Sequence, residues 1–202
     1  VFLGRLRERA QHAGVNSADV RQRHGELEET LVEQQGGVQL YVLGRRGASA
    51  EVTQRDLGRN LERVVRALQK PILTVTEGFQ EPSRVLLAFD GRGPSRRGVE
   101  LIASNPLFRG LSIHVLMSGR ERRDSRKQLD WARSTLRRAD IDAGASLVPG
   151  DAESIIARHV QDERIDLLLM GAYSHSPLRS LLLGSRTSDL LRSARIPSLL
   201  LR

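Results

Sequence analysis

The sequence predicts an α/β fold in which an open parallel sheet carries helices on both faces, and it predicts this unit twice. Apolar runs alternate with amphipathic stretches along the second half of the chain, as in strands joined by crossover helices. The chain also repeats itself: Gly58 to Pro71 and Gly184 to Pro197 both span 13 residues, so these two units align at an offset of 126. A repeat of this length indicates a duplicated domain, since solenoid units repeat about every 20–50 residues.

The second copy shows the order of elements that such a fold requires. Strands are predicted at 84–89, 111–117, 145–148, 165–170 and 197–201. Helices are predicted at 95–102, at 121–139, from 151 onward and at 184–193. The first strand is a continuous apolar run, which is typical of a strand buried on both faces. Ser95 and Asp151 can cap their helices, and the long helix has an apolar stripe of Leu129, Ala132 and Leu136.

Three segments of the second copy are expected to meet at one edge of its sheet. Asp90, the residues after Met117 and the loop that begins at Gly171 all follow predicted strands. Ligands of open parallel sheets bind at the carboxyl ends of the strands, where the strand order reverses. We therefore expect a binding site at this rim.

The loop that begins at Gly171 carries most of the functional signal. Glycine lets backbone N–H groups approach an anion closely. Gly184 and Ser185 open a helix whose free N–H groups and dipole favour phosphate, and Thr187 adds a hydroxyl donor. The alternative is that Gly171 and Gly184 serve packing alone. Repetition of the pattern in the first copy favours the phosphate interpretation, although inherited geometry could also produce it.

Composition restricts the class of protein. The 202 residues include no cysteine, which excludes disulfides, thiolate metal sites and a cysteine nucleophile. The formal net charge is +8, of which residues 83–202 carry +7. This charge reflects either an arginine-rich solvated surface or a second copy that faces an anion. Only 3% of the residues are aromatic, so a nucleic-acid-binding module is the least favoured class.

Other features argue against further classes. No apolar run is long enough to span a membrane, and the arginine-rich stretch after Leu3 is not that of a signal peptide, so a cytoplasmic protein is expected. The histidines lack metal-ligand spacing; His114 is expected to pack in the core, and His175 lies beside the functional loop. Ser185 has no evident base, which argues against nucleophilic catalysis. Trp131 is expected in the core or at an interface.

The pattern Gly171-x2-Ser174-x9-Gly184-Ser185, with Asp90 after the first strand and His114-Val115 in the second, resembles the signature of the universal stress protein family. The resemblance extends over residues 84–202. It implies five parallel strands ordered 3-2-1-4-5 with four helices, and a loop that grips the phosphates and ribose of ATP. The implied cofactor is ATP or AMP, with Mg²⁺ as an optional companion.

The resemblance also implies roles for particular residues. Asp90 and Val115 would hold the adenosine end, and Ala88 stands where some nucleotide-binding members have proline. Met170 would lie under the loop. The residues implied to surround the phosphates are Gly171, Ser174, Gly184, Ser185, Arg186 and Thr187. Among them, Ser174 replaces the second glycine of the signature.

Residues 1–77 resemble the later part of another copy, which makes the chain a tandem protein with a linker at 78–83 and a complete domain at 84–202. The first copy lacks counterparts of the first two strands. Val20–Arg23 and Val38–Leu43 are therefore expected not to join one sheet. Either an N-terminal segment is missing from this sequence, which we favour, or another chain fills the gap.

The last strands of the two copies, Pro71 to Val75 and Pro197 to Leu201, would be sheet edges in the family's strand order. An apolar edge invites pairing with another strand. We therefore expect these two strands to lie side by side and antiparallel. The result would be a pseudo-twofold pair of domains within the chain, with a homodimer as a further option.

Two functional hypotheses follow. The first is a stress-response module that binds ATP or AMP in the second copy and thereby changes its conformation or choice of partner. The second is a scaffold of the same family that has lost nucleotide binding and acts through protein partners. Asp90 and the positive charge favour the first, whereas Ser174 and the incomplete first copy favour the second. No catalytic residue is assigned, and slow ATP hydrolysis is the most that is expected.

Overall fold

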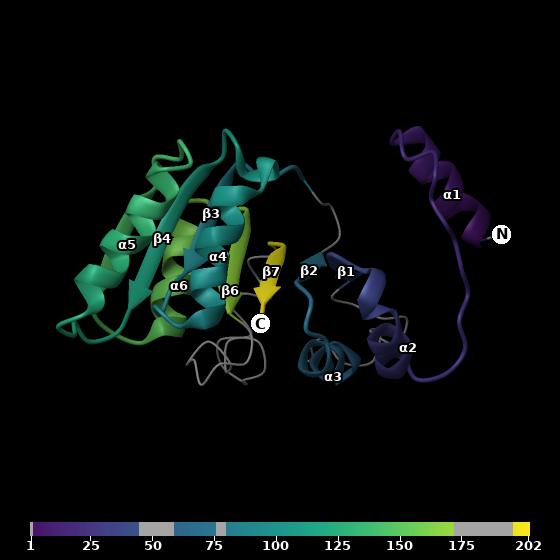
Figure 1. Cartoon of the computed structure of the whole chain (residues 1–202), viewed down its shortest axis with the longest axis horizontal. Coiled ribbons are helices and arrows are strands. Elements are labelled where there is room, and N and C mark those ends of the chain that lie inside the picture. The colour runs from purple at the N-terminus through teal and green to yellow at the C-terminus, as the bar shows by residue number, and fades with distance from the viewer. Residues whose placement is uncertain (1, 45–58, 76–79, 172–195) are drawn as a thin grey trace.

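The computed structural model describes residues 2–44, 59–75, 80–171 and 196–202, and these form a mixed sheet with helices on both faces (Figure 1). The strands are β1 (Tyr41–Gly44), β2 (Ile72–Val75), β3 (Arg84–Ala88), β4 (Ser112–Ser118), β5 (Gly144–Val148), β6 (Leu167–Gly171) and β7 (Ser198–Leu201). The helices are α1 (Phe2–His12), α2 (Leu27–Gln34), α3 (Arg59–Ala67), α4 (Gly93–Ser104), α5 (Ser125–Arg137) and α6 (Ala152–Asp162), with short 3₁₀ turns at Gln35–Gly37 and Pro106–Phe108.

The strands form one sheet in the order β1-β2-β7-β6-β3-β4-β5, and every neighbouring pair is parallel except β2 with β7. Residues 84–202 contribute β3 to β7, and the described earlier residues contribute β1 and β2. This seven-stranded sheet differs from the predicted pair of five-stranded sheets. Strands β1 and β2 extend the sheet of residues 84–202 by edge pairing, and in the described residues they do not build a sheet of their own.

The antiparallel pairing predicted for the two last strands is confirmed. Leu73 on β2 lies opposite Leu199 on β7, and Thr74 lies opposite Ser198. The Thr74 hydroxyl donates to the carbonyl oxygen of Ser198 at 3.2 Å. Each strand would otherwise expose a row of unpaired backbone groups, so the pairing satisfies both edges at once.

The other strand predicted in the first copy does not form. Residues 20–23 have no regular secondary structure, whereas β1 pairs in parallel with β2. The prediction that Val20–Arg23 and Val38–Leu43 do not join one sheet is therefore confirmed. Helix α1 lies apart from the sheet in Figure 1, while α2 and α3 pack against each other beside β1 and β2. None of the described helices is long and apolar enough to cross a membrane.

Two hydrophobic cores lie on opposite faces of the sheet. Leu86 and Leu168 belong to the core beneath α6 and α3, whereas Val85 and Leu87 belong to the core beneath α4 and α5. Successive residues of a strand point to opposite faces, so β3 contributes to both cores. The buried first strand and the apolar stripe of the long helix are thus confirmed as predicted.

Of the two predicted capping residues, one caps its helix and the other does not. Asp151 caps α6, because its carboxylate accepts a hydrogen bond from the backbone N–H of Ser154 at 2.9 Å. Ser95 does not cap α4: the helix begins at Gly93, and the N-cap residue is Arg92. Pro94 in the first turn explains this earlier start, since proline has no N–H to leave unpaired and its φ suits a helix.

Candidate functional site

The carboxyl ends of β3, β4 and β6 lie side by side, which brings together the three segments that the sequence placed at one rim. Ala88 at the end of β3 pairs with Leu116 on β4 and with Met170 on β6. Asp90 follows two residues after Ala88, and Gly171 follows directly after Met170. Strand order reverses here, because the chain leaves β3 towards β4 on one side and later returns to β6 on the other.

Three of the predicted site residues have no side chain available to a ligand at this rim. Ala88 and Met170 belong to the core beneath α6, and Val115 belongs to the core beneath α4 and α5. All three are at most 1% exposed. Any contact that they make with a ligand must therefore come from their backbone.

Asp90 presents at the rim one carboxylate oxygen that accepts no hydrogen bond from the described residues. Its Oδ1 accepts hydrogen bonds from the Ser95 hydroxyl at 2.7 Å and from the Arg92 backbone N–H at 3.0 Å. Among the described residues, its Oδ2 is contacted only by the Arg92 guanidinium, in an ion pair with Nε at 3.9 Å. About a quarter of the side chain is exposed, at 24%. An ionised carboxylate only accepts hydrogen bonds, so this oxygen suits a hydroxyl or amine donor.

Gly171 is required by close packing at the start of α4. A Cβ added there would lie 2.9 Å from Cβ of Pro94, closer than such atoms approach in proteins. The same rim contains Gly91, whose φ of +74° is unfavourable for other residues and whose Cα is covered by the Gln128 side chain. The packing role proposed as an alternative for Gly171 therefore has direct structural support.

The phosphate side of the predicted site lies outside the described residues. This part includes Ser174, Gly184, Ser185, Arg186 and Thr187, together with His175. Their proposed contacts with phosphate, and with Mg²⁺, stay predictions.

Exposed arginines gather in the turn that follows β4. Arg120, Arg122 and Arg123 are exposed, and the turn leads from the carboxyl end of β4 into α5. The sequence showed the positive charge of this half but not its position. Because this turn starts at the carboxyl end of β4, its positive charge raises the local concentration of anionic ligands at the rim, an effect that salt screens.

A cluster of Phe89, Trp131 and Arg96, which includes a cation–π contact, adjoins Asp90. Trp131 on α5 stacks against Phe89 with a centroid separation of 6.3 Å, and the Arg96 guanidinium lies 4.2 Å from the Trp131 ring. Phe89 immediately precedes Asp90, and Arg96 immediately follows Ser95. Trp131 is packed against the core as expected, and as the single tryptophan it can report on this rim.

His114 and His159, the described histidines of the second half, lie against each other away from the rim. Nε2 of His114 lies 2.8 Å from the Ser146 hydroxyl, and its ring centroid is 4.7 Å from that of His159. Burial lowers the pKa of the His114 imidazole and the charge of His159 lowers it further, while Glu163 opposes both effects. The predicted core position is confirmed. Across the described ranges, no group of three or more histidine or acidic residues could hold a metal ion.

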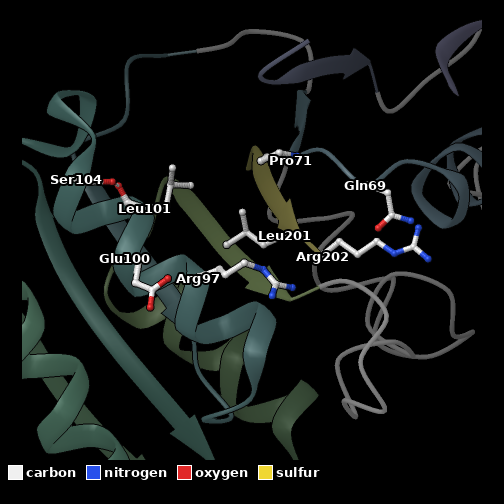
Figure 2. Close-up of a pocket in the computed structure, with 8 residues that line it drawn as sticks. All are labelled: Gln69, Pro71, Arg97, Glu100, Leu101, Ser104, Leu201 and Arg202. Carbon is white, nitrogen blue, oxygen red and sulfur yellow. Dashed lines mark hydrogen bonds between the residues drawn. The ribbon is translucent and has the colours of Figure 1, made fainter. Parts of the chain in front are cut away.

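A cavity of about 360 Å³ lies away from the rim, between α4 and the β2–β7 junction (Figure 2). It is lined by Gln69, Pro71, Arg97, Glu100, Leu101, Ser104, Leu201 and Arg202. Nη1 of Arg202 donates to the carbonyl oxygens of Arg66 and Leu68, at 2.7 and 3.1 Å. This side chain therefore ties the end of β7 to the end of α3 and belongs to the β2–β7 junction.

Comparisons with known proteins agree on one family. The model of the universal stress protein family matches residues 82–202. A curated relative, universal stress protein Slr1230 from Synechocystis, is 35% identical over 204 residues, which cover 100% of this chain and 71% of the relative. The family model matches one stretch only, so the predicted tandem arrangement is not shown by it.

Solved structures share the fold. A universal stress protein from Archaeoglobus fulgidus superposes with a TM-score of 0.78 at 18% identity, over 99% of this chain and 74% of its own. A putative universal stress protein from Pseudomonas aeruginosa superposes with a TM-score of 0.59 at 15% identity, over 98% and 77%. These similarities extend over nearly the whole chain, including the residues before 82.

Proposed function

Because the chain belongs to the universal stress protein family, we propose that it binds an adenine nucleotide, ATP or AMP, at the rim formed by β3, β4 and β6. The observation that carries the proposal is the open Oδ2 of Asp90 at the point where the strand order reverses. The bound nucleotide acts as a regulatory ligand in a stress-response module.

The described residues fit the nucleoside end of such a ligand. Asp90 offers an acceptor for a ribose hydroxyl or a base amine. The backbone at the ends of β3, β4 and β6 is close by, although the side chains of Ala88, Val115 and Met170 are buried. We propose that the phosphates lie towards the loop after Gly171. The described residues offer no carboxylate cluster for Mg²⁺, so the cation would accompany ATP through its phosphates.

Helix α4 gives this rim a direct connection to the β2–β7 junction. Its first turn contacts Gly171, and a Cβ added at Gly98 would lie 2.9 Å from Leu87 and 3.0 Å from Leu201. Residues further along α4 line the cavity at the junction (Figure 2). A nucleotide that shifts the start of α4 would therefore alter the junction, which is how occupancy could reach a partner.

Two measurements on the purified chain test the proposal. Mass spectrometry of the ligand released on denaturation should identify an adenine nucleotide if one co-purifies. Calorimetric titration with ATP and with AMP, each with and without Mg²⁺, should show saturable binding. Absence of binding at millimolar nucleotide in all four titrations would rule the proposal out.

A second candidate function has its own structural support. Gly171 is explained by its contact with Pro94, and the side chains of Ala88, Val115 and Met170 are explained by the cores. A family member that acts as a scaffold through protein partners, without nucleotide, would need nothing more from these residues. Failure of all four titrations would favour this alternative.

We further propose that residues 1–77 are the later part of a second domain of the same family. The β1–β2 and β6–β7 units are both parallel and share one register, because Gly44 pairs with Val75 as Gly171 pairs with Leu201. Each unit also ends its first strand in glycine. Equal register in two units related by a sequence repeat supports a duplication.

The junction between these units supports a pseudo-twofold arrangement. Leu73 and Leu199 occupy equivalent places in the repeat, 126 residues apart, and they lie directly opposite each other. A twofold axis through an antiparallel strand pair requires such self-pairing of equivalent residues. The same pairing between two chains would give a homodimer.

A further inference from the structure

We propose that Ser95 is a positioning residue for the nucleotide, because it fixes the Asp90 carboxylate so that Oδ2 faces the ligand. The inference rests on the proposed nucleotide site and adds a residue that the sequence had assigned to helix capping. Ser95 itself is 2% exposed and does not touch the ligand.

The Ser95 hydroxyl makes three contacts with the turn that begins at Asp90. Its Oγ lies 2.7 Å from Oδ1 of Asp90, 3.1 Å from the carbonyl oxygen of Arg92 and 3.3 Å from the backbone N–H of Asp90. A hydroxyl has one proton to donate, and the shorter contact with a charged acceptor is the stronger. The proton therefore goes mainly to the carboxylate, and the hydroxyl oxygen accepts from the Asp90 N–H.

These contacts leave Asp90 with one oxygen for a ligand. The Ser95 hydroxyl and the Arg92 N–H both donate to Oδ1, from different directions, and so fix the orientation of the carboxylate. The alternative acceptor of the Ser95 hydroxyl is the Arg92 carbonyl oxygen, which is uncharged and more distant at 3.1 Å, so releasing the carboxylate would exchange a stronger hydrogen bond for a weaker one. Preorganisation of this kind lowers the entropy that a ligand must overcome on binding.

The simpler explanation is that Ser95 only helps to start α4. Ser125 provides the comparison, because it is also buried at a helix start and its Oγ accepts a hydrogen bond from the Arg122 backbone N–H at 3.0 Å. Among the described residues, Ser125 makes no hydrogen bond to a carboxylate. A helix in this fold thus starts with a buried serine and no acidic partner, which makes the Ser95–Asp90 contact an additional feature.

The first test compares Ser95→Ala with the matched variant Ser125→Ala in the full chain. Titration with AMP and with ATP should give a dissociation constant about tenfold higher for Ser95→Ala, as expected for a lost hydrogen bond to a charged group. Ser125→Ala should stay within about twofold of wild type. Trp131 fluorescence and circular dichroism establish that both variants are folded.

The second test separates positioning from a general weakening of the fold. In the Asp90→Ala background, Ser95→Ala should weaken nucleotide binding by less than about twofold, because there is no carboxylate left to position. The same additional loss in both backgrounds would overturn the inference. So would a Ser95→Ala affinity equal to that of Ser125→Ala. If wild type itself binds no nucleotide, the proposed function fails, and this inference fails with it.

Discussion

Two parallel strand pairs correspond in the sequence repeat but are buried to different extents: the first unit is β1–β2 and the second unit is β6–β7. In β6 and β7 every residue is buried, whereas in β1 Val42 is 58% exposed and Gly44 is also exposed. The second unit lies between β3 and β2 and has helices over both faces. The first unit has α2 and α3 over one face, and its other face points away from both helices.

The difference shows that neighbouring elements, more than the unit's own sequence pattern, determine burial. Leu73 and Leu199 are equivalent in the repeat, yet Leu199 is buried and Leu73 is only partly so. Helix α4 lies over β7 and has no counterpart over β2 in the described chain. The first unit therefore depends on its pairing with β7, while the second half contributes to both hydrophobic cores.

The largest expected effect comes from breaking the β2–β7 junction. Leu73→Pro lies in a strand with neighbours on both sides, so it should cost about 3 kcal/mol or more. Hydrogen exchange should show that β1 and β2 lose protection while β3 and β4 keep it. Leu73→Val, which keeps the backbone donor, should leave both regions protected. Uniform loss of protection across the chain would show that the two halves unfold as one unit.

A second pair of variants compares the two halves by packing. Leu86→Ala removes a side chain with no exposed surface and should cost about 2–5 kcal/mol. Val42→Ala, on the exposed face of β1, should change stability by no more than about 0.5 kcal/mol. Urea titrations provide the measurement. A large effect of Val42→Ala would show that something covers this face in solution.

A third prediction places nucleotide in the second half alone. Titration should give at most one site per chain, because the described residues before 78 contain no counterpart of Asp90. Asp90→Ala should weaken binding by about a hundredfold, since it removes a charged acceptor. Asp124→Ala removes a carboxylate from the same rim, and Asp124 makes no side-chain capping bond, so it serves as the control. Two sites, or equal effects of both variants, would contradict the assignment.

Sequence periodicity predicted most elements because strand and helix periods are local properties. The apolar run of β3, the stripe of α5 and the Asp151 cap follow directly from residue spacing. The β2–β7 pairing was predictable because both strands are apolar edges of one repeat. The number of strands in the sheet was not, because edge pairing joins two copies that a sequence pattern treats separately.

The candidate site was less accessible to sequence reasoning. Ser95 was predicted to cap α4, but the helix begins two residues earlier, at Gly93. The sequence pattern did not indicate that earlier start. The contact of Gly171 with Pro94 joins segments that are far apart in the chain, and no local pattern reports it. Ala88 and Val115 point to opposite faces of the sheet, which only the strand pairing makes clear.

A fourth prediction concerns Ser174, where the family signature has glycine. A side chain there costs about 1–2 kcal/mol if the left-handed backbone conformation is needed. Its hydroxyl could return about 0.5–1.5 kcal/mol through a hydrogen bond to phosphate. Ser174→Gly should therefore tighten ATP by up to about tenfold, and adenosine by less. Equal gains for both ligands in calorimetry would show that this loop does not hold the phosphates.

The smallest expected effect is the acid sensitivity of the second half, which depends on His114. Its pKa is lowered in the folded chain by burial and by His159, so between that value and the ordinary 6.5 the unfolded chain binds more protons than the folded one. Stability is therefore complete above about pH 6.5 and decreases as the pH falls below it.

The change that tests this is His114→Gln, which keeps a polar partner for Ser146 but cannot titrate. Its urea midpoint should fall less than that of wild type between about pH 7.5 and about pH 5. His12→Gln is the matched control, because His12 is exposed on α1 and bonded only to the Glu8 carbonyl oxygen. It should leave the wild-type pH dependence unchanged. If both variants keep that dependence, the acid sensitivity arises elsewhere, and the half-buried pair His114 and His159 does not distinguish the second half from the first.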